Sequence, residues 1–452
     1  MKKQFILPFL FCLSLVGSAQ TVYQPNWASL DTRLAPAWFS DARFGLFIHW
    51  GLYSVPAWAT KSNADGFGSG YAEWYWQRLH TPSLKIHKEF KAFHEQHYGP
   101  NFRYQDFVSM FTCELFNPEE WATLFQQSGA KYIVLTSKHH EGFTLWPSAQ
   151  AWNWNALDVG PHRDLAGDLS VAIKKKGLHM GFYYSLYEWY NPTYKANVHQ
   201  YVEEHMIPQM KDLVTKYEPD VLWTDGEWEQ SAKTWESEKF LAWLYNESPV
   251  KDRIVVNDRW GNDTKGKHGT FLTSEYGQGN VAQGKPWEEC RGIGESFGYN
   301  RNENLEDYQS STQLIHQLIS VVSRGGNFLL NIGPTADGRI PVIMQERLHD
   351  LGEWLKVNGE AIYGTQRWEK APVSKTMFFT QKGKDLYVFS TEWPAQLEID
   401  GIQKQTNVRL LGYSGKITQQ LSGQKLKITP PILKPGTFAN QAAWVFKLEK
   451  AL

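Results

Sequence analysis

Cysteine is scarce in this 452-residue chain, which contains three. Cys12 falls in an N-terminal apolar stretch, so Cys113 and Cys290 are the two that a processed protein would keep. Neither has C-x-x-C or Cys/His zinc spacing, which argues against a structural metal site. In an oxidising compartment the two could pair, or both could stay buried as free thiols, and the sequence leaves both arrangements open.

The chain also lacks an excess of charge of either sign. Its 46 Lys and Arg residues balance 47 Asp and Glu residues, and the sequence pI is about 6.9. Such a balance gives no reason to expect nucleic acid or an anionic membrane as a partner.

Long apolar runs are missing outside the N-terminus. Lys2 and Lys3 precede an apolar stretch at residues 5–16, and small residues at 17–19 come before Gln20. This pattern predicts a signal peptide at 1–19, cleaved after Ala19, and hence a periplasmic or secreted protein. No later segment reaches the about 18 uninterrupted apolar residues of a membrane span.

Aromatic residues, by contrast, are abundant. The chain has 21 Trp and 21 Tyr, many of them in short clusters rather than in periodic stripes. Exposed rings suit the apolar C–H faces of sugars, so the bias fits a carbohydrate-active enzyme. The same rings could simply fill a core.

The middle of the chain alternates short β-rich runs with helical patterns. The runs lie at 44–50, 132–137, 180–185, 221–224, 254–257, 271–274 and 328–332, and several are almost continuously apolar, as in parallel strands covered on both faces. One helical face joins Leu314, Leu318 and Val321, and another helix is expected to stop near Asn358. We therefore predict an α/β fold with a (β/α)8-like, TIM-type barrel over residues 20–364.

The pattern changes after residue 364. Residues 377–380 and 386–390 flank a polar turn at Gly383, which predicts a hairpin. Leu426 and Ile428 alternate with lysines, and residues 443–448 resemble a final strand. Residues 365–452 are therefore predicted to form an all-β sandwich.

Polar residues follow the predicted strands, where the active sites of such barrels lie. Asp225 comes directly after an apolar strand, as a nucleophile would, although a turn or helix-capping Asp is common there too. A retaining glycosidase needs a second carboxyl group. Glu275, at the end of the sixth run, is the first candidate, and Glu288 in the loop that we expect to follow is the alternative.

The pair His139-His140 raises the possibility of a metal site completed by His49. Adjacent residues at the end of a strand are expected to point in opposite directions, which disfavours one ion bound by both. Hydrogen bonds to sugar hydroxyls, or to the backbone of a core, explain such histidines equally well. We expect no metal and no organic cofactor.

Seven stretches, in this order, carry a family resemblance: FGLFIHWG (44–51), EWY (73–75), KHHEGF (138–143), LWTD (222–225), NDRW (257–260), SFGYN (296–300) and GGNFLLNIGP (325–334). Together they resemble glycoside hydrolase family 29, the α-L-fucosidases, and within it the exported bacterial enzymes of broad specificity. The resemblance implies a retaining, exo-acting hydrolase of terminal α-L-fucosyl residues on oligosaccharides or glycoconjugates.

The resemblance also implies a role for each matching residue. Asp225 would be the nucleophile and Glu275 the acid/base, with Arg259 orienting the acid/base region and Trp223 lining the pocket. Phe47 and Phe297 would receive the C5 methyl group of fucose. The sugar hydroxyls would be held by His49, Glu73, Trp74, His139, His140 and Tyr184.

Three other functions are compatible with parts of this pattern. They are a barrel glycosidase for another sugar, such as a galactosidase, a sugar-binding protein without catalysis, and a metallohydrolase using His49, His139 and His140. A methyl group in an apolar pocket contributes only about 1–3 kcal/mol of discrimination, so fucose selection must also use hydroxyl geometry. The loops at 61–70 and 261–269 are expected to form the leaving-group subsite.

Overall fold

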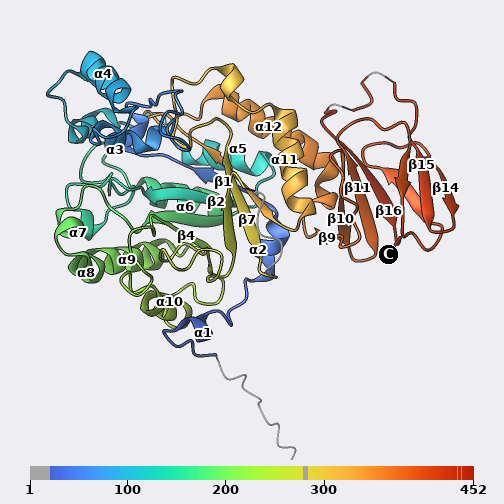
Figure 1. Cartoon of the computed structure of the whole chain (residues 1–452), viewed down its shortest axis with the longest axis horizontal. Helices are drawn as coiled ribbons and strands as arrows, with labels where there is room; N and C mark the ends of the chain where they lie inside the picture. Colours follow the sequence, from blue (N-terminus) through green and yellow to red (C-terminus); the bar gives the residue numbers. More distant parts are fainter. Residues whose placement is uncertain (1–20, 278–283, 435, 439) are drawn as a thin grey trace, which may run out of the picture.

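The computed structural model describes residues 21–277, 284–434, 436–438 and 440–452. A barrel-like α/β domain comes first, and a smaller all-β module follows it at the C-terminus (Figure 1). The predicted signal peptide lies outside the described residues. Within them, no helix has both the length and the apolar character that crossing a bilayer would need.

Eight parallel strands form the barrel sheet, in the spatial order β5-β4-β3-β2-β1-β8-β7-β6. They are β1 (Phe44–Ile48), β2 (Tyr132–Lys138), β3 (His179–Ser185), β4 (Val221–Asp225), β5 (Val255–Val256), β6 (Leu272–Glu275), β7 (Trp287–Gly292) and β8 (Asn327–Ile332). This is the circular order of a TIM-type barrel opened between β5 and β6. At that seam Thr270 N still donates to Val256 O at 3.0 Å. The predicted TIM-like fold class is confirmed.

Strand β7 was not predicted, because its sequence, WEECRG, contains no apolar run. Its residues alternate between two environments instead. Trp287 packs against Gly326 outside the barrel, whereas Glu288 and Cys290 face the barrel interior. Glu288 therefore lies in a strand, and our expectation that it lies in a loop is wrong.

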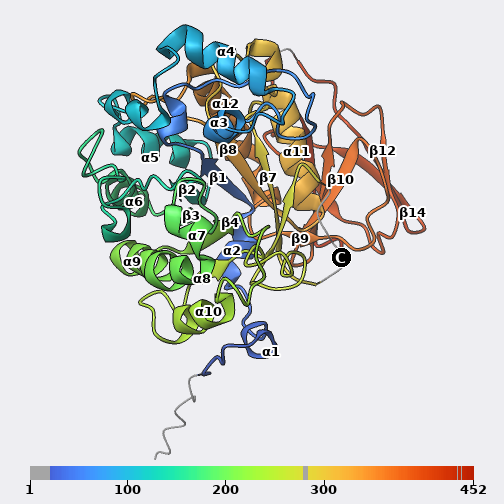
Figure 2. The same cartoon turned by 60° about the vertical axis from the view of Figure 1, so that its left-hand side comes forward.

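Helices cover the outer face of the sheet (Figures 1 and 2). The α-helices of the described residues are α1 (Trp27–Leu30), α2 (Ala37–Ala42), α3 (Tyr75–Leu79), α4 (His87–Tyr98), α5 (Pro118–Gln127), α6 (Leu165–Lys175), α7 (Pro192–Ala196), α8 (Val198–Tyr201), α9 (Ile207–Tyr217), α10 (Ser237–Asn246), α11 (Ser311–Ser323) and α12 (Val342–Asn358). Among the described residues no helix follows β5 or β6, so the expected regular alternation is wrong at this seam.

Local sequence explains where the helices next to the sandwich begin and end. The Ser310 hydroxyl accepts from Gln313 N at the start of α11, and the Gln313 side chain bonds back to Ser310 N, so that two otherwise unpaired amides are satisfied. The predicted face of Leu314, Leu318 and Val321 is buried. Helix α12 ends at Asn358, as predicted.

Short helix α2 closes the N-terminal end of the barrel. Phe39 lies 4.5 Å from Phe271 and 5.7 Å from Tyr132, ring centre to ring centre, inside the barrel cluster. Aromatic residues thus fill the lower barrel, and the cavity described below lies at the opposite end of the strands.

The C-terminal module is a sandwich of two antiparallel sheets. Its strands are β9 (Gln366–Arg367), β10 (Met377–Lys382), β11 (Asp385–Ser390), β12 (Leu397–Ile399), β13 (Asn407–Leu410), β14 (Thr418–Ser422), β15 (Lys425–Thr429) and β16 (Trp444–Glu449). The predicted hairpin is β10–β11, and Leu426 and Ile428 are buried between the sheets. Trp354 in α12 donates to Ala443 O at 3.0 Å, which fixes the sandwich to the barrel.

Candidate active site

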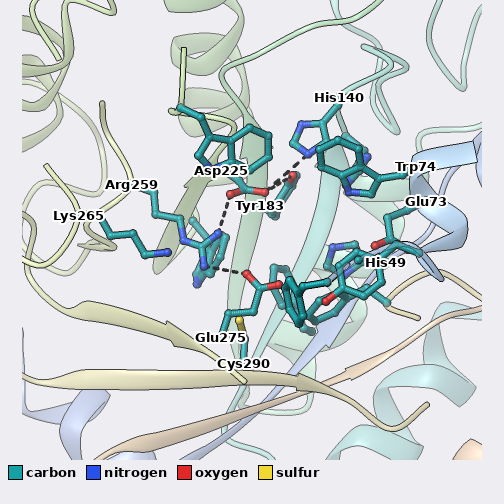
Figure 3. A pocket seen from close by; sticks show the side chains of 18 of the residues that line it. His49, Glu73, Trp74, His140, Tyr183, Asp225, Arg259, Lys265, Glu275 and Cys290 are labelled. Carbon is teal, nitrogen blue, oxygen red and sulfur yellow. Dashed lines mark hydrogen bonds and ion pairs between the residues drawn. The ribbon is translucent and has the colours of Figure 1, made fainter. Parts of the chain in front are cut away.

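A cavity of about 330 Å³ opens at the C-terminal ends of the barrel strands (Figure 3). All but two of the residues predicted for the site line it: Phe47, His49, Glu73, Trp74, His139, His140, Trp223, Asp225, Arg259, Glu275 and Phe297. The two exceptions are Tyr184 and Glu288. Strand ends and loops far apart in the sequence thus converge on one space.

Asp225 ends β4 and faces the cavity with its carboxylate fixed on both sides (Figure 3). Arg259 Nη1 donates to Oδ1 at 2.7 Å, and the Tyr183 hydroxyl donates to Oδ2 at 2.9 Å. His140 Nε2 lies 3.8 Å from Oδ2. These bonds fix the orientation of the carboxylate before any substrate is bound, as a nucleophile requires.

One guanidinium joins the two predicted catalytic carboxylates. Arg259 Nη2 donates to Glu275 Oε2 at 3.1 Å, while Nη1 holds Asp225. Burial opposes the charge of the guanidinium. The carboxylates of Asp225, Glu275 and Glu227 outweigh burial, however, and hold the pKa of Arg259 well above its ordinary value. Arg259 therefore stays charged and keeps both carboxylates at one cavity.

Glu288 lies inside the barrel, away from the cavity. Its side chain accepts from the Tyr132 hydroxyl at 2.5 Å and from Trp223 Nε1 at 2.9 Å, and 1% of the residue is exposed. Burial raises the pKa of Glu288 to about 7. The cavity wall thus separates this carboxyl group from any substrate, whereas Glu275 reaches the cavity directly.

The three histidines lie together on one wall. His49 Nδ1 is 2.6 Å from Asn331 Oδ1, and His140 Nδ1 is 2.7 Å from Ser185 Oγ. Burial first, and repulsion from His139 second, hold the pKa values of His49 and His140 well below the ordinary range. Both rings are therefore neutral. Asn331 Oδ1 can only accept, and the Ser185 hydroxyl donates to Tyr187 O, so each ring donates from Nδ1 and its Nε2 is left to accept one hydrogen bond.

Our expectation that His139 and His140 point in opposite directions is wrong. Both line the cavity, and their ring centres are 4.1 Å apart. Strand β2 ends at Lys138, and Gly142 N bonds His139 O in a turn, so strand alternation no longer applies. In the part of the chain that is described, no group of three His, Cys, Asp or Glu side chains could hold a metal ion.

Glu73 and two phenylalanines lie next to the histidines. Glu73 accepts from Gly298 N at 2.8 Å, and burial raises its pKa above the ordinary value. The rings of Phe47 and Phe297 lie 4.6 and 5.0 Å from that of His49. A polar acceptor and an apolar wall thus face the same space.

Known proteins resemble this chain over almost its whole length. The α-L-fucosidase family model matches residues 10–360, and the α-L-fucosidase C-terminal domain model matches residues 370–449. Tissue α-L-fucosidase of Rattus norvegicus is 44% identical, with 96% of this chain and 94% of the rat protein covered. The α-L-fucosidase of Dictyostelium discoideum is 42% identical, with 97% and 95% covered.

The solved structure of Thermotoga maritima α-fucosidase in complex with fucose is 38% identical, with a TM-score of 0.80 over 94% of this chain and all of that chain. This chain belongs to the α-L-fucosidase family. The family prediction is confirmed, and it is favoured over a galactosidase. The bacterial, exported and broad-specificity parts of that prediction stay predictions.

Within the fucosidase fold, Tyr184 is misassigned by our sequence analysis. Its hydroxyl donates to Gln209 Oε1 in α9 at 2.8 Å, and Lys138 Nζ lies 4.0 Å from its ring centre, on the outer face of β3. Successive strand residues point to opposite faces, so Tyr183 is the one that lines the cavity and bonds Asp225.

We expect Tyr183→Phe to lower kcat/KM for an aryl α-L-fucoside by about 10- to 100-fold, because a hydrogen bond to a charged carboxylate is lost. Tyr184→Phe removes the neighbouring hydroxyl outside the cavity and should change kcat/KM by less than about threefold. Steady-state kinetics of both variants would measure this difference. Equal losses in the two would contradict the assignment.

Several cavity residues were not singled out from the sequence: Phe67, Gly68, Tyr71, Arg78, Trp228 and Lys265. Cys290 also lines the cavity, although the sequence suggested only a disulfide or a buried thiol for it. Gly68 and Lys265 come from the two loops that we expected at the leaving-group side, so the loops were indicated although their residues were not. Cys113 and Cys290 are both free and buried.

Proposed function

We propose that this chain hydrolyses terminal α-L-fucosides with retention of configuration, with Asp225 as the nucleophile and Glu275 as the acid/base. Hydrolysis of α-L-fucosides is the activity of the family to which it belongs. The assignment of roles rests mainly on one observation, the Arg259 guanidinium that spans both carboxylates at the edge of the cavity. Retention requires two carboxyl groups close together, one on each side of the scissile bond.

The first step forms a covalent intermediate. A carboxylate oxygen of Asp225 attacks C1 of fucose, the bond from C1 to the leaving oxygen breaks, and Glu275 gives its proton to that oxygen. In the second step Glu275 takes a proton from water, the water oxygen bonds C1, and the Asp225 carboxylate departs. Arg259 and Tyr183 are already bonded to Asp225 before the substrate binds, so the nucleophile is oriented for the attack.

Fucose recognition is proposed to use the neutral histidines and the apolar wall. His49, His139 and His140 would bond hydroxyls, and the buried Glu73 carboxyl group would bond another. Phe47 and Phe297 would face the C5 methyl, with about 1–3 kcal/mol of discrimination from that contact. Simple aryl fucosides should suffice as substrates, which is the proposed broad specificity.

The decisive experiment follows the anomer that is released. With 4-nitrophenyl α-L-fucoside, proton NMR during the first minutes should show α-L-fucose, with the β-anomer appearing later by mutarotation. Initial release of β-L-fucose would mean single displacement and would overturn the role of Asp225 as nucleophile. Absence of hydrolysis of this substrate would contradict the activity.

We also propose that the chain is exported. The support is its N-terminal sequence, in which two lysines precede an apolar stretch and small residues at 17–19. A processed protein that begins at Gln20 is expected, and N-terminal sequencing of material from the periplasm or medium would decide it.

A further inference from the structure

The outer part of the cavity is built from four side chains that the proposed chemistry does not use: Phe67, Arg78, Trp228 and Lys265, here called the cavity mouth. They come from the loop before η2 (Ala72–Trp74), from α3, and from the loops after β4 and β5. Phe67 is 71% and Trp228 42% exposed, whereas Asp225 is among the buried residues. A sugar bonded to fucose would have to leave past these four side chains.

The two aromatic residues of the mouth are held from behind. The Trp228 ring centre lies 5.8 Å from that of Trp74 and 5.3 Å from that of His140. Phe67 lies edge-on, 5.6 Å from both Tyr71 and Tyr276. Such support keeps the exposed ring surfaces in place for contact with the apolar face of a sugar.

The charges of the mouth differ from those deeper in the cavity. Arg259 pairs with two carboxylates, but among the described residues no carboxylate lies within 4.0 Å of a cationic nitrogen of Arg78 or Lys265. Residues 278–283, outside the described part, include no Asp or Glu. The mouth therefore carries two positive charges without an ion-pair partner there.

The two cations are placed differently. Arg78 Nη2 donates to Gly68 O at 3.0 Å and its guanidinium lies 4.9 Å from the Trp74 ring centre, so it also fixes the loop that carries Phe67. Glu73 and Asp65 act on Arg78 through their charges, and Lys265 acts on buried Glu227. Lys265 is exposed, and its side chain extends toward the cavity beside Arg259 (Figure 3).

We propose that the cavity mouth is a leaving-group subsite for an anionic sugar, in which Lys265 and Arg78 attract a carboxylate or a sulfate ester on the residue joined to fucose. Phe67 and Trp228 contact the ring of that residue. This inference rests on the proposed function, because it takes the leaving group to depart from Asp225 toward the mouth. Attraction of an anion toward these two cations raises the encounter rate and the affinity, which both act on kcat/KM.

The test uses aryl α-L-fucosides in matched pairs. With a phenol as the leaving group, the position at which the natural substrate joins fucose to the next sugar need not be known. The 3-carboxyphenyl fucoside is compared with the neutral 3-carbamoylphenyl fucoside, and the 3-sulfophenyl with the 3-sulfamoylphenyl fucoside. We expect kcat/KM to favour each anion by about three- to tenfold at low ionic strength. The ratio should fall toward one as salt is added, because exposed charges are screened.

Substitutions then locate the effect. Lys265→Gln should reduce the anion-to-neutral ratio at least twofold, and Lys265→Glu should bring it below one. The quantity compared is the ratio of kcat/KM for the anionic substrate to kcat/KM for its neutral partner. A general loss of activity lowers both values equally, and a difference in leaving-group acidity is the same in variant and parent, so neither changes the comparison of their ratios. Lys267→Gln is the matched control, since Lys267 is an exposed lysine of the same loop that does not line the cavity and bonds Asp263 O.

Each outcome decides. A preference in only one pair identifies the anion as carboxylate or sulfate. A ratio of one in both pairs, or a ratio that Lys265→Glu does not change, overturns the anionic subsite while 4-nitrophenyl α-L-fucoside is still hydrolysed. Failure to hydrolyse 4-nitrophenyl α-L-fucoside as well would contradict the proposed function instead.

Discussion

Replacing Asp225 with Gly should lower kcat for 4-nitrophenyl α-L-fucoside by about 10³-fold or more, the largest loss expected for any single substitution in the chain. Without this carboxylate no covalent intermediate forms, and Glu275 alone cannot supply both functions. Steady-state kinetics would measure the loss, with circular dichroism to show that the fold is kept.

Added azide should restore part of the activity of the Asp225→Gly protein. The small anion can occupy the space left by the carboxylate, next to Arg259. In this variant Arg259 has lost its bond to Asp225 and keeps the bond to Glu275. A nitrogen of azide bonds C1 as the bond to nitrophenolate breaks, on the face that Asp225 would have attacked. The product should therefore be β-L-fucosyl azide, which NMR distinguishes from the α-anomer.

Asp252→Gly is a control for the same replacement elsewhere, because Asp252 is exposed in the turn before β5. It should leave kcat within about twofold of the parent. If Asp225→Gly instead kept its activity, the nucleophile would be another carboxyl group. Glu227 would be the first to examine, since burial and the charge of Asp225 raise its pKa to about 7 and it lies two residues away.

The parts of the fold that were predictable from sequence are those where burial on both sides leaves a continuous apolar run. Strands β1 to β4 and β8 meet this condition, and each was located to within about two residues. Strand β7 does not, because its inward positions carry Glu288 and Cys290, which are accommodated by Tyr132 and Trp223 from other strands. Partners so distant in sequence are not visible in a local pattern.

The site could be located from sequence, but not the direction of every side chain. Asp225 and Trp223 share a face of β4, and the register pairs Trp223 with Tyr183, so strand pairing identifies Tyr183 as the inward tyrosine. That pairing joins two strands far apart in the sequence and becomes known only from the three-dimensional structure. Loop residues such as Phe67 were beyond prediction, because their positions depend on contacts such as Arg78 with Gly68 O rather than on any period.

Glu275→Ala should show whether Glu275 or Glu288 is the acid/base, because loss of the acid/base makes kcat/KM depend strongly on the acidity of the leaving group. For fucosides with poorly acidic leaving groups, kcat/KM should fall by about 10²- to 10⁴-fold, because no proton is supplied to the departing oxygen. For 4-nitrophenyl α-L-fucoside the first step should be much less affected. The fucosyl-enzyme should then accumulate, giving a burst of nitrophenolate. Azide should attack this intermediate and yield α-L-fucosyl azide, the opposite anomer from that of Asp225→Gly.

Glu288→Gln is the matched control, and its main effect should be on stability. Burial raises the pKa of Glu288 from 4.5 to about 7, so between these pH values the folded chain binds more protons at this group than the unfolded chain. The stability that the neutral carboxyl group contributes is present below pH 4.5 and is lost as the pH rises through 7. Glutamine is neutral throughout.

The free energy of unfolding of the variant, relative to that of the parent, should therefore increase by about 3 kcal/mol from pH 4.5 to pH 8. Denaturant titration of both proteins at each pH would measure it. Its leaving-group dependence should match that of the parent, because Glu288 faces Tyr132 and Trp223 rather than the cavity. If Glu288→Ala rather than Glu275→Ala gave the nitrophenolate burst and α-L-fucosyl azide, the acid/base would be Glu288. Its strand would then have to shift during the reaction to bring the carboxyl group to C1.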